Sequence, residues 1–529
     1  MEENANKNIT NSSLTLVGDF EGINIVAKKE LENDSKVTSA VWYEKIRAAV
    51  EYQESHLIFK SAIARILKRN IVITPKIKAT KLLNTLINEL VWANYITPKT
   101  IDEEKFNEIE SVLEKYLEII RFANSSHKTR TELVQFFSGL SAAEVEEIIN
   151  PKDADMKFID FVFNAVADNF DHTKSQITEE ENTIQIKLAV ITNVLKPDAS
   201  LLGYYALLMV EPNWKKISKE EIKKVSRSVD PFINKIDKHI HHPFRSQYLI
   251  ATRNLAAPFV VFRTTLLSKD ITKKIVEKNP SILIQNCMEI YESLKQESNN
   301  RIWRGTLRAL IFVFLTKIIL AFLLEVPIDK YLHGSIIWLA LMVNISLPPF
   351  LMFLSGLTIP KIPMKNNKQI QNSLEEIIWR GKLETEKKTE IGYKKETRSS
   401  TFFGYLLSLI SIVILFLVIW GLIVLDFSII SIILFLIFVS AVSFLSFRIR
   451  TSSKELIVKR RPQDSVTSVM ELVFIPFIRI GKMMSDGLNR LNPFLLALDF
   501  IIEAPFKTII RILRSWFAFI SSKKEELEY

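Results

Sequence analysis

Four apolar runs between Arg301 and Arg450 constrain this chain more than any other feature, because each approaches the length of a membrane crossing. A helix needs roughly 20 apolar residues to cross the hydrocarbon core of a bilayer. No comparable run precedes Arg301 in the 529 residues, so the chain divides into a soluble part and a membrane part. The runs pair into two hairpins, at 309–357 and 402–447, and they predict four transmembrane helices.

Basic residues lie at the outer ends of both predicted hairpins. Those flanking the first are Arg301, Arg304, Arg308, Lys361, Lys365 and Lys368, and the second ends at Arg448 and Arg450. Lys330 is the only Lys or Arg in the turn expected at 325–334. Because cytoplasmic loops of membrane proteins carry the excess of Lys and Arg, we expect a multi-pass membrane protein with both termini in the cytoplasm. The net charge of +10 fits the same interpretation.

Two polar residues interrupt the first pair of apolar runs. Lys317 lies about eight residues into the first run, where a charged side chain costs roughly 2.5 to 3.5 kcal/mol on insertion scales. Asn344 lies about nine residues into the second, so antiparallel helices would bring the two to similar depth. We expect them to face each other or a shared polar cavity. The pair can line an ion or substrate path, but a role in helix packing is favoured, because transport pathways present more polar groups.

The whole chain is predicted to be all-α: a helical cytoplasmic domain, a polytopic helical membrane region and amphipathic interfacial C-terminal helices. The helical domain rests on apolar residues at helical spacing and on capping-box patterns at Thr100/Glu103, Ser141/Glu144, Thr178/Glu181 and Ser218/Glu221. The expected organisation is a disordered tail (1–36), a soluble helical domain (37–300), hairpin 1 (301–358), a basic cytoplasmic loop (359–401), hairpin 2 (402–447), and a basic segment with interfacial helices (448–529).

The C-terminal segment has an apolar face with basic residues opposite or beside it. These residues are Lys507, Arg511 and Arg514. Such a basic amphipathic helix is typical of segments that lie in the headgroup plane of a bilayer. Two alternatives stay open: packing of these helices against the soluble domain, and a proline-broken hairpin at 494–520 that dips into the membrane.

The only metal-like cluster in the sequence is Asp237, His239, His241 and His242, directly before Pro243. We favour a helix C-terminus here, where basic groups interact well with the helix dipole, over a metal site. The single cysteine, Cys287, excludes an intramolecular disulfide. No phosphate loop or familiar catalytic motif occurs, so neither a cofactor nor an enzymatic activity is predicted.

Three functions remain open for a chain of this organisation. The first is a membrane scaffold or assembly component that binds the lipid bilayer and holds a protein partner on residues 37–300. The second is an oligomeric transporter or channel subunit with a polar site at Lys317 and Asn344. The third is a lipid-acting enzyme at the membrane interface, whose candidate residues are Asp486, Asp499, Glu503 and the cluster around His239. Nucleic acid is not an expected partner, since basic and acidic residues are interleaved.

Overall fold

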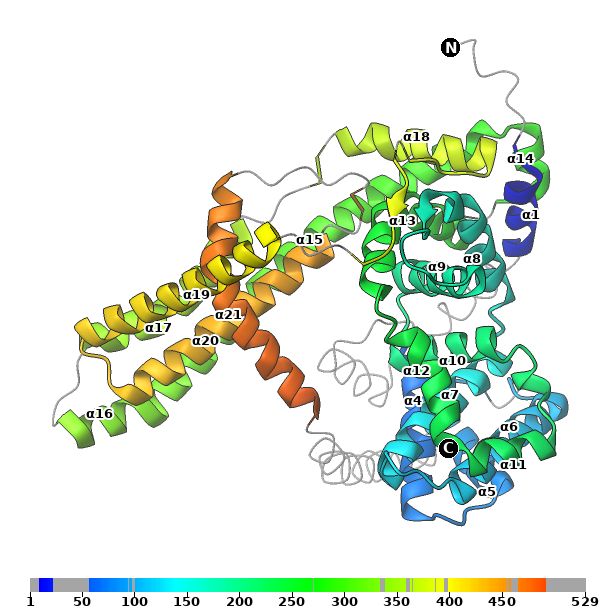
Figure 1. Cartoon of the computed structure of the whole chain (residues 1–529), viewed down its shortest axis with the longest axis horizontal. Coiled ribbons are helices and arrows are strands. Elements are labelled where there is room, and N and C mark those ends of the chain that lie inside the picture. Colours follow the sequence, from blue (N-terminus) through cyan, green and yellow to red (C-terminus); the bar gives the residue numbers. More distant parts are fainter. Residues whose placement is uncertain are drawn as a thin grey trace, which may run out of the picture. The chain divides into compact units, whose positions relative to one another are not determined.

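The computed structural model describes residues 9–21, 57–93, 95–97, 100–269, 271–333, 338–357, 362–363, 365–385, 387–393, 398–453, 456–457 and 465–490. These residues are almost entirely helical, which confirms the all-α prediction (Figure 1). The chain forms two compact units. Unit 1 comprises Met1–Cys287 and Gln371–Tyr393, and unit 2 comprises Met288–Ile370 and Lys394–Tyr529.

Unit 1 is a stack of antiparallel and crossed helices around an apolar core. Its helices are α1 (Asn11–Phe20), α4 (Ile58–Ile73), α5 (Ala79–Trp92), α6 (Glu103–Phe122), α7 (Arg130–Ile149), α8 (Asp153–Val166), α9 (Glu179–Val194), α10 (Ala199–Val210), α11 (Lys219–Arg227), α12 (Val229–Ile240), α13 (Arg245–Ser268) and α14 (Lys273–Lys278). Helix α7 packs against α4, α6 and α10, and α13 packs along α9. Phe137, Phe158 and Phe262 are fully buried among them, so the apolar stripes of the sequence form the core of unit 1.

Helix α1 lies where the sequence led us to expect a disordered tail. Thr10 caps its N-terminus by accepting from the backbone N–H of Ser13. Leu16, Val17 and Phe20 are buried against α8 and α14, and the ring of Phe20 meets that of Phe158 edge-on, with 6.2 Å between centroids. The remaining parts of the tail, 1–8 and 22–36, lie outside the described residues. Tertiary contacts thus stabilise a helix too short to form alone.

The capping patterns locate two helix starts in unit 1 and miss two others. Ser218 and Glu221 form the expected capping box at α11, and Thr178 caps α9. Ser141 instead lies buried inside α7, whose capping box is Thr129 with Glu132. Asp102, rather than Thr100, caps α6. The hydroxyl-x-x-Glu pattern also arises inside helices, so only tertiary context identifies the true start.

The loop between the predicted hairpins is part of the fold of unit 1. Helix α18 (Lys365–Arg380) begins it, and strand β2 (Thr389–Glu390) then pairs in parallel with β1 (Phe170–Asp171). The backbone N–H of Leu383 donates to the carbonyl of Ala165 at 3.0 Å. The backbone of Gly392 exchanges two hydrogen bonds with the side-chain amide of Gln247. The segment Gln371–Tyr393 is therefore built into the helical domain.

Unit 2 contains the apolar helices. They are α15 (Ser281–Leu320), whose first residues up to Cys287 belong to unit 1, a π-helical segment (Ala321–Glu325), α16 (Val326–His333), α17 (Trp338–Leu357), α19 (Arg398–Val424), α20 (Ile429–Ser453) and α21 (Ser465–Arg490). Within the described residues, three helices are long and apolar enough to cross a membrane: Ser281–Glu325, Tyr405–Val424 and Ile429–Ile449. The fourth predicted crossing corresponds to α17, whose apolar part, Ala340–Leu354, is shorter. The turn expected at 325–334 is helical as far as His333.

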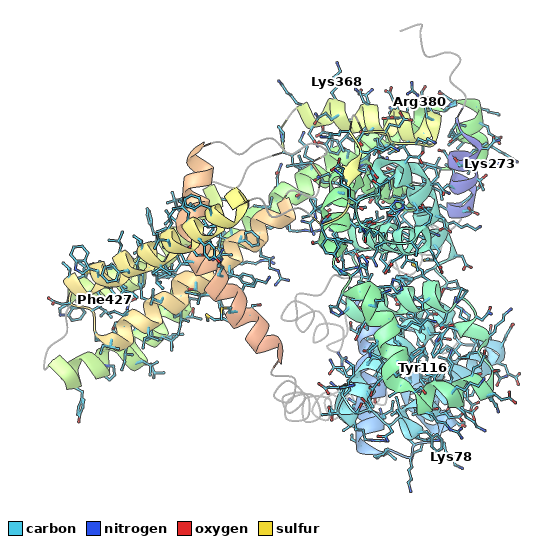
Figure 2. The ribbon with its side chains drawn as sticks, viewed as in Figure 1. Lys78, Tyr116, Lys273, Lys368, Arg380 and Phe427 are labelled. Carbon is cyan, nitrogen blue, oxygen red and sulfur yellow. The ribbon has the colours of Figure 1, made fainter. Side chains whose placement is uncertain are left out.

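Large apolar side chains cover the outside of the candidate spans (Figure 2). On the span Ser281–Glu325 they include Phe312 at 65% and Phe322 at 57% exposure, and on α19 they include Phe416 at 65% and Trp420 at 58%. Contiguous apolar surface of this extent is not tolerated in water, but it is the normal exterior of a helix in lipid. The exposed faces therefore favour membrane association.

The inner faces of the unit 2 helices meet in two small apolar clusters. One contains Ala340, Leu422, Phe427, Phe435, Val439 and Phe477, and the other contains Val313, Met352 and Val442. Helix α21 packs against α20 and α19. Gly481 lies close to the backbone of α20, since an added Cβ would be 2.4 Å from the carbonyl oxygen of Ser440. Such close backbone approach at a glycine is typical of membrane helix packing.

A tight turn joins α19 to α20. Asp426 ends α19 in the left-handed conformation with φ of 57°. The N–H of Phe427 donates to the carbonyl of Leu422, and the N–H of Asp426 donates to the carbonyl of Ile423. These two bonds make a Schellman motif, which satisfies carbonyls that would be costly to leave unpaired in lipid. Phe427, labelled in Figure 2, and Leu422 are both buried and complete the motif with an apolar contact.

Candidate functional site

The most unusual polar group of unit 2 is a buried cluster of Lys317, Glu325 and Asn344. The Nζ atom of Lys317 donates to Oε1 of Glu325 at 2.6 Å, and Nδ2 of Asn344 donates to Oε2 of the same carboxylate at 2.5 Å. The three residues are 0%, 1% and 1% exposed. Lys317 and Asn344, identified from the sequence, are thus brought together through an acid that links them.

The cluster joins elements from three parts of unit 2. Lys317 comes from α15, Glu325 closes the π-helical segment that follows it, and Asn344 comes from α17. The ammonium of Lys317 also lies 5.0 Å from the ring centroid of Phe438 on α20. A cation over an aromatic face is attracted by the ring quadrupole. The site therefore connects both hairpins.

Glu325 is the residue that sequence reasoning missed. Its position directly after the apolar run suggested a short turn, but the helix continues through the π-helical segment to His333. A signal was present in the sequence, since an acid two helical turns beyond an intramembrane lysine is a natural partner for it. The π-helix that aligns the two has no sequence signature of its own.

The chemistry of the cluster is that of a compensated charge. One ammonium and one carboxylate neutralise each other, so the desolvation cost of each is offset by a short charge-assisted hydrogen bond. The Oδ1 atom of Asn344 is buried and accepts no hydrogen bond within the described part of the chain. The site can thus accept one further hydrogen-bond donor, such as water.

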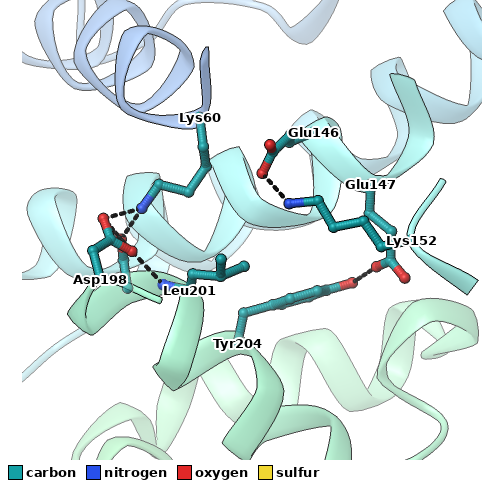
Figure 3. A network of polar contacts seen from close by, with 8 residues as sticks. Lys60, Glu146, Glu147, Lys152, Asp198, Leu201 and Tyr204 are labelled. Carbon is teal, nitrogen blue, oxygen red and sulfur yellow. Dashed lines mark hydrogen bonds and ion pairs between the residues drawn. The ribbon is translucent and has the colours of Figure 1, made fainter. Parts of the chain in front are cut away.

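A second polar network joins α4, α7 and α10 of unit 1 (Figure 3). Lys60, which is 1% exposed, donates to the carboxylate of Asp198 and to Oγ of Ser200. Asp198 also caps α10 by accepting from the N–H of Leu201 at 2.9 Å. Burial lowers the pKa of Lys60 although Asp198 opposes the shift. The contacts of Lys60 with Asp198 and Ser200 thus hold α4 against the start of α10.

Two further contacts of Figure 3 surround the end of α7. Lys152 donates to Glu146 at 2.9 Å, and the hydroxyl of Tyr204 donates to Glu147 at 2.8 Å. Burial raises the pKa of Glu146, and Lys152 opposes that shift. The charged groups of Lys60, Lys152, Glu146 and Glu147 each have a partner among neighbouring side chains, which indicates a structural role.

A third buried group joins α7 to α6. Lys115 donates to Glu144 at 2.6 Å, and the hydroxyl of Tyr116 donates to the other oxygen of this carboxylate at 2.8 Å. The indole N–H of Trp214 donates to the Tyr116 oxygen at 2.9 Å. Burial lowers the pKa of Lys115 and raises that of Tyr116. Glu144, considered at first as part of a helix cap, is the acceptor at the centre of this group.

The histidine cluster lies at the end of α12, as the sequence analysis favoured. His239 is in the last turn, and His241 ends the helix by donating its N–H to the carbonyl of Asp237. Nδ1 of His242 accepts from the N–H of Phe244 at 3.2 Å, so this nitrogen is not free for a metal. Among the described residues, no group of three or more His, Cys, Asp or Glu side chains is placed to hold a metal ion.

The remaining candidate residues lie outside the described part of the chain. These are Asp499, Glu503, Lys507, Arg511 and Arg514. Asp486 lies in α21, and its side chain also belongs to the part that is not described. Comparison of the chain with protein-family models, curated proteins and solved structures finds no match. The site must therefore be interpreted from its own geometry.

Proposed function

We propose that this chain is an integral membrane scaffold, in which two helical hairpins hold a helical domain at the cytoplasmic face of a bilayer for binding a protein partner. The bilayer association rests on the exposed apolar faces of the candidate spans. The scaffold role rests on how the domain is connected to the hairpins.

The observation that carries the proposal is the incorporation of Gln371–Tyr393 into unit 1. Unit 1 thus contains the chain immediately before the first hairpin and the chain after it. A folded domain lies on one side of a bilayer, so both ends of the first hairpin must emerge on that side. This supports α15 and α17 as an outgoing and a returning arm, and it anchors the domain at two separate points of the chain.

A buried asparagine supports the same arrangement for the second hairpin. Nδ2 of Asn366 donates to the hydroxyl of Tyr291 at 2.9 Å and to the carbonyl of Leu456 at 2.7 Å. Tyr291 precedes the apolar part of α15, Asn366 follows α17, and Leu456 follows α20. The three chain segments meet at one place, which favours an even number of crossings in each hairpin. The basic residues at these ends favour the cytoplasm for that side.

Single cysteines in a Cys287→Ala background test this topology. Exposed positions Glu104 and Lys387 represent the domain and the loop, and Tyr331, which is 89% exposed, represents the far end of hairpin 1. In sealed inside-out vesicles, we expect a membrane-impermeant maleimide to label the first two positions and not the third. In right-side-out vesicles the pattern should reverse. Labelling of Lys387 and Glu104 from opposite sides would exclude the proposal.

Crosslinking of the full-length protein in its native membrane, followed by mass spectrometry, tests the partner. We expect crosslinks from lysines of α4 to α14 to a second protein species. Crosslinks confined to copies of this chain, with their sites on α15 to α21, would contradict the scaffold.

A second function, an oligomeric transporter or channel subunit, is favoured by one observation. The Lys317, Glu325 and Asn344 cluster places charged groups in apolar surroundings, and Asn344 keeps an unused acceptor. Intramembrane ionisable residues often mark substrate or proton paths. Assays of ion or substrate flux across proteoliposome membranes distinguish the two functions. A scaffold gives no flux, whereas a transporter gives a flux that Lys317→Met abolishes.

A further inference from the structure

The π-helical segment Ala321–Glu325 aligns Glu325 with Lys317. A regular α-helix turns 100° per residue, so the eight residues between the two positions turn about 800°, which is about 80° beyond two full turns. A π-bulge accommodates one extra residue in a turn. This takes back about 100° and leaves the two side chains about 20° apart on one helix face. The short contact of 2.6 Å therefore depends on the bulge.

The π-helical segment depends in turn on the contact between Lys317 and Glu325. Lys317 and Glu325 are 0% and 1% exposed, so opening their contact would leave two unpaired charges in apolar surroundings. An uncompensated buried charge costs several kcal/mol, which makes the closed pair strongly favoured. Asn344 adds a second hydrogen bond to the same carboxylate. The polar contacts thus stabilise a backbone irregularity in the sequence 321–325, which holds no Gly or Pro. Pro327, two residues later, adds to this preference, because its ring nitrogen cannot donate to the carbonyl of Leu323.

We propose that Lys317, Glu325 and Asn344 form a register clamp, which holds the π-bulge and thereby sets the rotation of α16. When the clamp opens, the helix returns to regular α geometry. The segment 326–333 then turns by about 100° and moves about 1.5 Å along the helix axis. Because Lys317 also contacts Phe438, and Asn344 lies on α17, opening the clamp releases three helices together. The first hairpin thereby has two discrete states.

A cysteine scan of positions 326–333 tests the clamp in the full-length Cys287→Ala protein, reconstituted in nanodiscs. Maleimide labelling rates along the scan follow helical periodicity. In Lys317→Met, we expect the maximum of this pattern to move by one residue. Lys295→Met is the matched control, since Lys295 lies on the same helix and pairs with Glu292 and Asn367 instead. It should leave the pattern unchanged.

Two double variants keep the test decisive if Lys317→Met fails to fold. Lys317→Met with Glu325→Leu removes both charges, so we expect a folded protein with the shifted pattern. Lys317→Glu with Glu325→Lys restores a salt bridge of opposite polarity and should restore the original pattern. An unshifted pattern in the apolar variant, or a shifted one in the charge-swapped variant, would overturn the clamp.

Discussion

At the residue scale, Glu144 accepts hydrogen bonds from two buried donors, Lys115 and Tyr116. We expect Glu144→Ala to lower the free energy of unfolding by about 3 to 5 kcal/mol, because it leaves a buried ammonium without its counter-charge. The double variant Lys115→Met with Glu144→Leu should recover most of this loss. Denaturant unfolding of the purified protein, followed by tryptophan fluorescence, measures both. Asp160→Ala is the control, because its contact with Lys187 is exposed and worth at most about 1 kcal/mol.

We expect His239 and His242 to make unit 1 sensitive to acid. Burial lowers the pKa of both imidazoles below 6.5, although Glu181 opposes the shift and Lys238 adds to it. The folded state therefore keeps them neutral when the unfolded state already binds protons. Their stability contribution is complete above pH 6.5 and is lost as the pH falls from there towards the folded pKa.

Thermal unfolding at pH 7.5 and pH 5.5 measures this effect. We expect the drop in midpoint temperature on acidification to be smaller in His239→Gln with His242→Gln than in the wild type. His127→Gln, at an exposed position, should keep the full drop. Equal drops in all three proteins would show that these histidines do not carry the acid sensitivity.

At the scale of elements, the contact between α20 and α21 depends on Gly481. An added Cβ would lie 2.4 Å from the carbonyl oxygen of Ser440 and 2.7 Å from Cβ of Phe444, and neither backbone can move without separating the helices. We expect Gly481→Ala to destabilise unit 2 by about 1 to 3 kcal/mol. Gly305→Ala meets nothing within 4 Å and should be neutral or slightly stabilising. Thermal stability in detergent micelles compares the two, and equal midpoints would contradict this packing.

At the scale of the whole molecule, Asn169 fastens the loop between the hairpins to the helical domain. Its Nδ2 donates to the carbonyl of Leu383 at 2.6 Å, and its Oδ1 accepts from the N–H and the hydroxyl of Thr385 at 2.9 Å. We expect Asn169→Ala to release the segment around Lys387 and Lys388 for tryptic cleavage. Limited proteolysis with mass spectrometry measures the rate. Asp168→Asn, which alters only an exposed contact with Lys382, should cleave at the wild-type rate.

The sequence by itself determined the all-α class, the apolar helices and the separation of a helical domain from them. These properties depend on helical periodicity and on run length, which are local quantities. Lys317 and Asn344 could be identified for the same reason, because a polar residue in an apolar run is visible without a structure. The end of α12 before Pro243 was likewise predictable from local stereochemistry.

Only the tertiary structure decided how these parts are joined. Helix α1 is stabilised by burial against α8 and α14, whose residues lie far along the chain. The loop Gln371–Tyr393 belongs to unit 1 because Asn169 and Gln247 satisfy its backbone, which no periodicity reveals. Glu325 became the partner of Lys317 through a single extra residue in one helical turn. Such an irregularity is settled by the free energy of burying two opposite charges together, and a linear pattern does not contain it.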